Sequence, residues 1–257
     1  MKIARRISVT AGLACAAAAA TLVIAADQPA TKRVVKPGTF CETQDHKACQ
    51  EAVTPRQVLD RLKTGNERFV AGKVTSRNYV RQVKATAAGQ YPLASIVSCI
   101  DSRAPAEILF DQGVGDVFNA RVAGNIVNED ILGSLEFASK AAGSKLVVVL
   151  GHTSCGAIKG ACDDAKLGNL TALIGKIKPA VAAVPNDGKD RSSKNDAFVQ
   201  MVAERNVRMT VQNIRDKSPV LKEMEDKGEI MIVGAMYDVK TGKVEWYTEA
   251  PAPAKKG

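Results

Sequence analysis

The chain has 257 residues, 46% of them hydrophobic and 25% charged, and its 36 basic and 27 acidic residues give a net charge of +9. These values exclude a disordered chain, a collagen-like chain and a protein with many membrane spans. Aromatic residues make up only 4% of the chain. That is too few for a surface that stacks on nucleic-acid bases, so we expect no nucleic-acid partner.

The first 25 residues have the pattern of an export signal. Lys2, Arg5 and Arg6 precede an Ala-rich apolar stretch, and small residues at 23–27 offer a cleavage site. We therefore expect residues 1–25 to be a signal peptide and the mature protein to be periplasmic or secreted, with no membrane attachment after cleavage. The alternative is an uncleaved membrane anchor, because the apolar run approaches the roughly 20 residues that a span needs.

The next segment, residues 26–53, contains two cysteines that we expect to form a disulfide. Cys41 and Cys49 flank a short polar stretch without helical or strand periodicity, and exported proteins commonly retain disulfides. Closing so short a loop contributes about 2.5 kcal/mol. The alternative is a metal site that includes His46, but Cys-x4-His-x2-Cys offers three ligands with no fourth nearby.

A globular domain is expected over residues 54–250. Thr54 can cap a helix that starts at Pro55 and runs to about Gly72, with apolar residues at helical spacing. After it, apolar runs typical of strands buried on both faces occupy residues 93–99, 117–122 and 146–150, and residues 129–142 show helical spacing. Strands that alternate with helices indicate a parallel sheet built from βαβ units.

The C-terminal half adds helices and an edge hairpin. The expected elements are a long helix over residues 195–217 after a polar loop at 183–194, a shorter helix from Pro219, and strands at 229–239 and 244–247 joined by a turn at 240–242. Residues 251–257 are expected to be a disordered tail. The predicted fold class is α/β, with a mostly parallel central sheet flanked by helices.

Side chains capable of chemistry follow two of the predicted strands. Cys99, Asp101 and Arg103 end the first strand and would share one face of an extended chain. His152 and Cys155 end the third apolar run and lead into another helix. Because parallel strands bring their carboxyl ends to one edge of a sheet, these groups are expected to converge.

Two thiolates and one imidazole form a donor set that suits zinc. With Cys99, His152 and Cys155 as ligands, a fourth position remains for water, which zinc acidifies, and Asp101 held by Arg103 can orient that water. Two alternatives remain open here. Asp101 could be the fourth ligand of a structural zinc site, or the two cysteines could be inert core residues.

These motifs resemble those of β-class carbonic anhydrases. Cys-x-Asp-Ser-Arg at 99–103 and His-x-x-Cys-Gly at 152–156, separated by 53 residues, match the two signatures of that family, and the similarity extends over residues 54–247. The resemblance implies one zinc per chain on Cys99, His152 and Cys155, with the Asp101–Arg103 dyad acting in the reversible hydration of carbon dioxide to bicarbonate. It also implies a homodimer or a higher oligomer, with the helix near 54–72 packed on a neighbouring subunit.

The resemblance further implies that Gln90 and Gly156 bind substrate. Members whose zinc site switches with pH have a pattern with Trp three residues before the first Cys, where this chain has Ile96. Members whose site stays open have a pattern with Gln nine residues before that Cys, and this chain resembles them with Gln90 at that position. We therefore expect an open site. The alternative functions are hydrolysis of carbon disulfide or carbonyl sulfide on the same fold, and a non-catalytic zinc-binding or thiol-redox protein.

Overall fold

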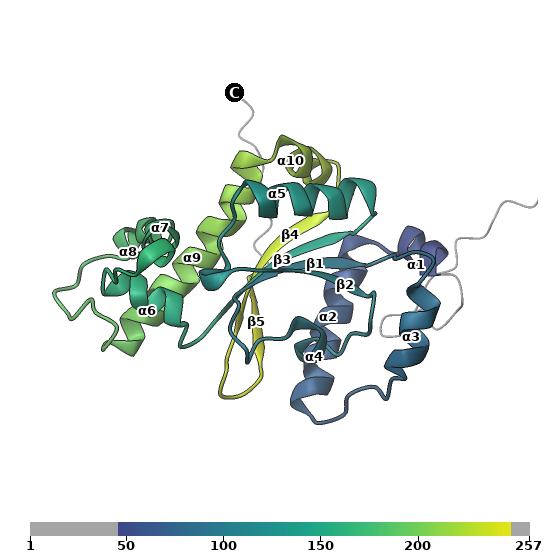
Figure 1. Cartoon of the computed structure of the whole chain (residues 1–257), viewed down its shortest axis with the longest axis horizontal. Coiled ribbons are helices and arrows are strands. Elements are labelled where there is room, and N and C mark those ends of the chain that lie inside the picture. Colours follow the sequence, from purple (N-terminus) through teal and green to yellow (C-terminus); the bar gives the residue numbers. More distant parts are fainter. Residues whose placement is uncertain (1–45, 248–257) are drawn as a thin grey trace, which may run out of the picture. The chain divides into compact units, whose positions relative to one another are not determined.

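A five-stranded sheet in the order β2-β1-β3-β4-β5 organises the chain (Figure 1). The structure is a computed structural model and describes residues 46–247. The first four strands are parallel and β5 is antiparallel to β4. The strands are β1 Ala94–Ser98, β2 Val117–Arg121, β3 Leu146–His152, β4 Met231–Tyr237 and β5 Val244–Tyr247. The predicted α/β class, with a mostly parallel sheet and a C-terminal hairpin, is confirmed.

Helices cover both faces of this sheet (Figure 1). Those of the first half are α1 His46–Ala52, α2 Pro55–Val70, α3 Tyr79–Thr86, α4 Ala106–Leu109 and α5 Glu129–Glu136, which continues as the π-helical turn Phe137–Ala141. Those of the second half are α6 Gly156–Cys162, α7 Gly168–Gly175, α8 Lys178–Ala183, α9 Asp196–Lys217 and α10 Pro219–Asp226. One apolar cluster joins α5, α6, α9 and α10 to the sheet, and the other joins α2 and α4 to its opposite face.

Helix α2 begins where the sequence predicts and packs on its own chain. The Thr54 hydroxyl accepts a hydrogen bond from the Gln57 amide, the Gln57 side chain accepts one from the Thr54 amide, and Pro55 occupies the first turn. Val58 and Leu59 are buried against the sheet. This face of the helix therefore packs on the sheet of its own chain, and the expected contact of the helix with a neighbouring subunit stays a prediction.

Strand β2 departs from the prediction of burial on both faces. Each of its five residues is partly or fully exposed, whereas β1 and β3 are buried throughout. Among the described residues β2 pairs only with β1 and forms one edge of the sheet. An apolar run alone does not distinguish a central strand from an edge strand, and this prediction was wrong for β2.

The long helix α9 packs against strands β3 and β4 of the sheet. Its residue Val207 is fully buried, and glycines in the two strands give it room. A Cβ atom built on Gly151 would lie 2.5 Å from Val207 Cγ2, and one built on Gly234 would lie 2.8 Å from Val207 Cγ1. Because real Cβ atoms do not approach so closely, these glycines set how near α9 lies to the sheet.

Helix α1 lies in the segment for which the sequence showed no periodicity. The buried Gln50 side chain donates hydrogen bonds to the carbonyl oxygens of Pro92, 2.7 Å away, and Ala142, 2.8 Å away. Residues 46–52 are thus attached to the start of β1 and to the end of the π-helical turn.

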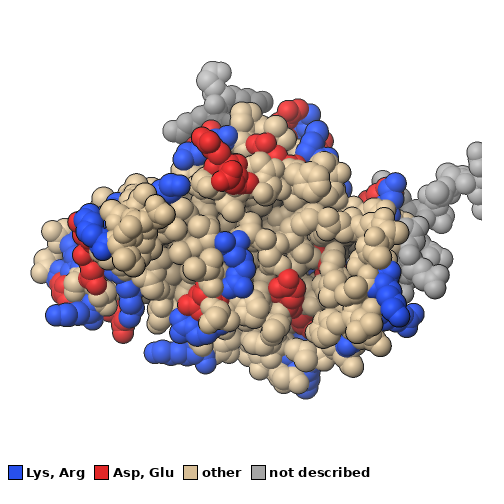
Figure 2. Space-filling view, in the orientation of Figure 1, with Lys and Arg blue, Asp and Glu red and all other residues tan. Residues whose placement is uncertain are grey.

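Two surface properties of the described residues bear on partners. In residues 46–247 no helix is both long and apolar enough to cross a membrane. Basic and acidic side chains are interspersed over the face drawn in Figure 2.

Candidate metal centre

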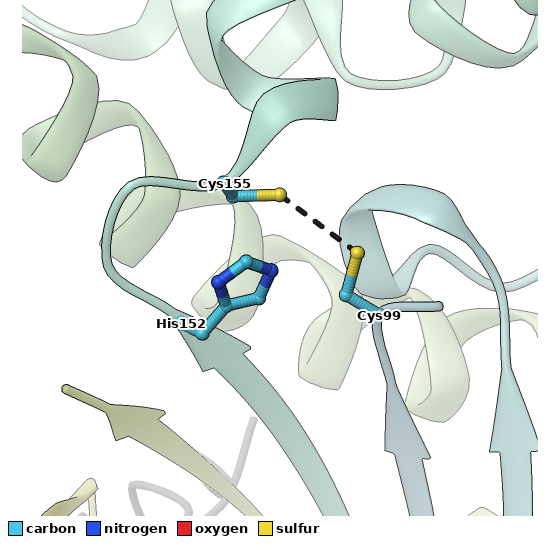
Figure 3. A group of neighbouring side chains, drawn as sticks. All are labelled: Cys99, His152 and Cys155. Carbon is cyan, nitrogen blue, oxygen red and sulfur yellow. Dashed lines mark hydrogen bonds between the residues drawn. The ribbon is translucent and has the colours of Figure 1, made fainter. Parts of the chain in front are cut away.

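Three buried side chains meet at the carboxyl ends of β1 and β3 (Figure 3). Cys99 directly follows β1, His152 is the last residue of β3, and Cys155 caps the start of α6. Because β1 and β3 are paired in parallel, both strands deliver these residues to the same edge. Their ligand atoms lie within 4.8 Å of one another, and the two sulfur atoms are 3.9 Å apart.

A sharp turn brings Cys155 back toward His152. Ser154 lies in the left-handed region with φ of +55°, and Thr153 is held from both sides. Its amide donates to Tyr237 O at 2.9 Å, and its hydroxyl donates to Asp238 Oδ1 at 3.2 Å. Strand β4 therefore supports the loop that carries the second thiol.

The imidazole of His152 has a defined tautomer and an unused nitrogen. Nδ1 lies 2.9 Å from the Thr153 carbonyl oxygen, which can only accept, so Nδ1 carries the proton. Nε2 is then a lone-pair acceptor, and it is buried without a hydrogen-bond partner among the described residues. A buried orphan acceptor is costly unless something binds it. With two sulfurs beside it, a zinc ion fits this donor set.

The two thiols of Cys99 and Cys155 shift each other's pKa in opposite directions. The hydrogen bond from Cys155 lowers the pKa of Cys99 to about 4, although burial opposes the shift, and the amide of Gly124 adds to the lowering. The same contact with Cys99, together with burial, raises the pKa of Cys155. The two sulfurs, 3.9 Å apart, are close enough for one divalent cation to bind both.

Asp101 and Arg103 form a bidentate ion pair beside Cys99, His152 and Cys155, the three residues that we call the metal cluster. Arg103 donates from its amide and Nε to Asp101 Oδ1, both at 2.9 Å, and from a terminal nitrogen to Oδ2 at 2.8 Å. These hydrogen bonds lower the pKa of Asp101 despite its partial burial. Asp101 Oδ2 lies 3.8 Å from His152 Nε2, so the carboxylate is next to the cluster but engaged by Arg103.

The chain path of this dyad differs from the prediction. Residues 101–104 form a turn closed by a hydrogen bond from the Ala104 amide to Asp101 O at 3.0 Å, whereas we expected an extended chain with alternate residues on one face. The two side chains meet because the turn folds Arg103 back over Asp101. The pairing was predicted, and its geometric reason was wrong.

Two further residues hold the site, and neither of them was assigned a role from the sequence motifs. Arg121 ends β2 and its guanidinium donates to Cys99 O at 3.0 Å and to Asp101 O at 2.6 Å. Asn206 of α9 donates to Gly124 O at 2.8 Å, and the Gly124 amide donates to Cys99 Sγ at 3.4 Å. Arg121 could have been found from its place at the end of a neighbouring strand, and Asn206 from its place as an amide in an apolar helix face.

The two predicted substrate-binding residues lie in different places. Gly156 is the first residue of α6, directly after Cys155, and a Cβ there would meet nothing within 4 Å. Gln90 precedes β1 and lines a pocket with Lys47 and Lys140 at the amino end of the sheet. The metal cluster is at the carboxyl end, so Gln90 does not reach the site of its own chain.

The predicted cysteine pair falls partly outside the described residues. Cys49 is buried on α1, and Cys41 lies before residue 46, so the disulfide stays a prediction. His46 begins α1, away from the metal cluster. The free cysteines in the described part of the chain are Cys99, Cys155 and Cys162.

The chain is similar to known carbonic anhydrases over most of its described length. The family model for carbonic anhydrase matches residues 94–244. Carbonic anhydrase 2 of Mycobacterium tuberculosis is 39% identical over 188 residues, which cover 71% of this chain and 87% of the relative. The β-carbonic anhydrase CafA of Aspergillus fumigatus shares 27% identity, with a TM-score of 0.57 over 74% of this chain and 90% of that one.

A further likeness, at lower identity, concerns the fold alone. A structure from a study of two tetrameric β-carbonic anhydrases of Sordaria macrospora is 24% identical and has a TM-score of 0.57, covering 74% of this chain and 96% of that one. Together with the Cys-His-Cys cluster and the adjacent Asp101–Arg103 pair, the matched family model places the chain in the carbonic anhydrase family, as a β-class enzyme that hydrates carbon dioxide.

Proposed function

We propose that this enzyme binds one zinc ion per chain through Cys99, His152 and Cys155 and performs the hydration of carbon dioxide at that ion. The observation that carries the proposal is the orphaned Nε2 of His152, buried beside two sulfurs. When bound, zinc lowers the pKa of a water ligand and so supplies the nucleophile near neutral pH. The role of the chain is to orient the reactants and handle the proton.

Asp101 is the residue that we assign to this task. Both of its oxygens accept from Arg103, which keeps the carboxylate ionised and fixes its direction. From its position 3.8 Å from His152 Nε2, Oδ2 can accept a hydrogen bond from the attacking water and aim the oxygen lone pair at carbon dioxide. The unfilled space at Gly156 leaves room for substrate next to Cys155.

We infer that the site stays open. Arg103 occupies both carboxylate oxygens of Asp101, so three side chains rather than four are available to the metal. A structural zinc site closed by Asp101 would need this ion pair to break. The sequence pattern of Gln90 and Ile96 favours the same conclusion.

A homodimer or a higher oligomer is the assembly that we propose. Tyr79, Val80 and Val83 of α3 are all more than half exposed, and no residue of that helix is buried. Phe118 of the exposed strand β2 and Phe137 line a surface cavity of about 510 Å³. If Gln90 contacts substrate, it must do so in the site of another subunit. Light scattering on the purified enzyme tests the assembly, and a monomer would contradict it.

Export and the Cys41–Cys49 disulfide remain proposals that rest on the sequence. N-terminal sequencing of the protein recovered from its native compartment should begin near residue 26. Its mass should fall by two hydrogens relative to the reduced chain. A full-length protein in the cytoplasm would contradict export, and a mass equal to that of the reduced chain would contradict the disulfide.

The central experiment combines a zinc assay with stopped-flow measurement of carbon dioxide hydration. We expect one zinc per chain and hydration activity that is lost on chelation and restored by zinc. An active enzyme whose zinc does not depend on Cys99, His152 or Cys155 would refute the assignment. Carbon disulfide, offered as an alternative substrate, should be turned over poorly.

A further inference from the structure

We propose that Asn206 of α9 is a positioning residue for the metal ligand Cys99 and acts through the backbone of Gly124. The inference rests on the proposed metal centre. Two hydrogen bonds carry it: Asn206 Nδ2 donates to Gly124 O at 2.8 Å, and the Gly124 amide donates to Cys99 Sγ at 3.4 Å. A side chain in a helix thereby connects to the sulfur at the end of β1.

Gly124 connects the two hydrogen bonds through its own backbone, in a conformation that glycine adopts readily. Its φ of +73° lies in the left-handed region, and a Cβ there would be 2.5 Å from Ile177 Cδ1, so a larger residue would be strained at this position. Glycine has the widest choice of backbone conformations, and something must select this one. The Asn125 amide bonds to Val122 O at 2.9 Å on one side, and Asn206 holds the carbonyl of Gly124 from the other.

The burial of Asn206 supports a specific task for its amide. The residue is 3% exposed, and its neighbours on the same helix, Ala203 and Val207, belong to the apolar core. Burying an amide without a partner costs about 1–3 kcal/mol. Leucine would suit the apolar contacts better, but it would leave Gly124 O without this donor.

The consequence for Cys99 follows from the hydrogen bond to its sulfur. An N–H donor directed at a thiolate fixes the position of the sulfur and moderates its charge. Loss of such outer partners typically weakens metal binding by about 10–100-fold. Asn206 does not contact the sulfur directly and acts through one further hydrogen bond, to Gly124. We therefore expect the zinc affinity to fall by about tenfold, the lower end of this range, when the Asn206 donor is removed.

The test uses the full chain with Asn206→Leu and Asn206→Asp. The aspartate variant keeps the side-chain volume, removes the donor and sets a carboxylate against a carbonyl oxygen. Asn213→Leu is the matched control, since Asn213 lies on the same helix and lines the same groove of about 950 Å³ as Asn206. The dissociation constant for zinc is measured by competition with a chromophoric chelator. The sulfur-to-cobalt charge-transfer band of the cobalt-substituted protein reports the geometry at the cysteines.

We expect weaker zinc binding and a shifted cobalt band for both Asn206 variants, with Asn213→Leu like the wild type. If the variants only lower the melting temperature of the metal-free protein, with zinc affinity and cobalt band unchanged, the residue is merely structural and the proposal is wrong. Should Asn206→Leu fail to fold, Asn206→Ser is subjected to the same two measurements. A wild-type cobalt protein without a sulfur charge-transfer band would instead contradict the proposed metal centre.

Discussion

Removal of the Asp101 carboxylate separates a catalytic dyad from a structural zinc site. In Asp101→Ala the three proposed zinc ligands remain, because Asp101 contacts Arg103 and is not part of the Cys-His-Cys cluster. The enzyme should therefore keep its zinc. It loses the one carboxylate that lies 3.8 Å from His152 Nε2 and with it the group that we assign to orient the water.

The size of the loss follows from what Asp101 does. Removing a positioned acid–base or orienting group costs about 10²-fold or more in rate, which is about 2.7 kcal/mol of transition-state stabilisation at 1.36 kcal/mol per factor of ten. Arg103→Ala should also inactivate, because it frees Asp101 to move toward the metal. The exposed residue Asp187, paired with Lys189 on a distant loop, provides the control variant Asp187→Ala.

Stopped-flow hydration rates and zinc stoichiometry are measured on all three variants. We expect Asp101→Ala to hold one zinc and be slow, and Asp187→Ala to match the wild type. A zinc-free Asp101→Ala protein together with a fully active Arg103→Ala protein would show that Asp101 is a metal ligand, and the mechanism above would have to be abandoned.

Three other predictions concern the metal, the fold and the proton. Cys155→Ala should lose zinc and activity together, by metal analysis and stopped-flow assay; a variant that retains both would remove Cys155 from the ligand set. Asp111, buried beside Arg68 and Arg77, has a lowered pKa because hydrogen bonds from these residues and Thr75 outweigh its desolvation. Its stabilising contribution should be complete above the unfolded value near 4 and decline as pH falls through the lower folded value. Urea titrations of Asp111→Asn against pH should lack this acid-side loss and show destabilisation of about 3–5 kcal/mol at neutral pH; an unchanged pH profile would count against the network. Finally, since the chain has only two histidines, one in the metal cluster and one on α1, turnover should rise with buffer concentration, and a several-fold loss in His46→Ala would disprove this.

The helices and strands that were predicted correctly from the sequence are those whose apolar residues are buried in the core. Strands β1 and β3 are continuous apolar runs and are fully buried, and α2 carries its own cap and an apolar face. Helix α3 has no buried residue and α7 buries only Ile174, and neither of these two helices was predicted from the sequence. The edge position of β2 was missed because an apolar run does not show how many neighbouring strands will pair with it.

In the candidate site, too, some features were predicted from the sequence and others were missed. The two motifs predicted which residues would converge, since strand ends in a parallel sheet must meet. The turn at 101–104 depends on backbone torsions, and the Asn206 donor lies on a helix about 80 residues further along the chain than Gly124. The spacing of residues within a motif predicts neither feature. Gln90 was assigned by position in a pattern, and its distance from the metal cluster emerges only from the direction of β1.

The two halves of the active site also differ in when they can exist during folding. Asp101 and Arg103 are two residues apart and can pair within a single local turn. Cys99 and His152, 53 residues apart, come together only after β1 and β3 have paired across a connection that contains α4, β2 and α5. A nascent or unfolded chain therefore has no preformed three-ligand site, and metal acquisition must follow the pairing of the central strands. Zinc bound at that stage would stabilise the pairing of β1 with β3, so metal release and separation of these two strands should occur as one event.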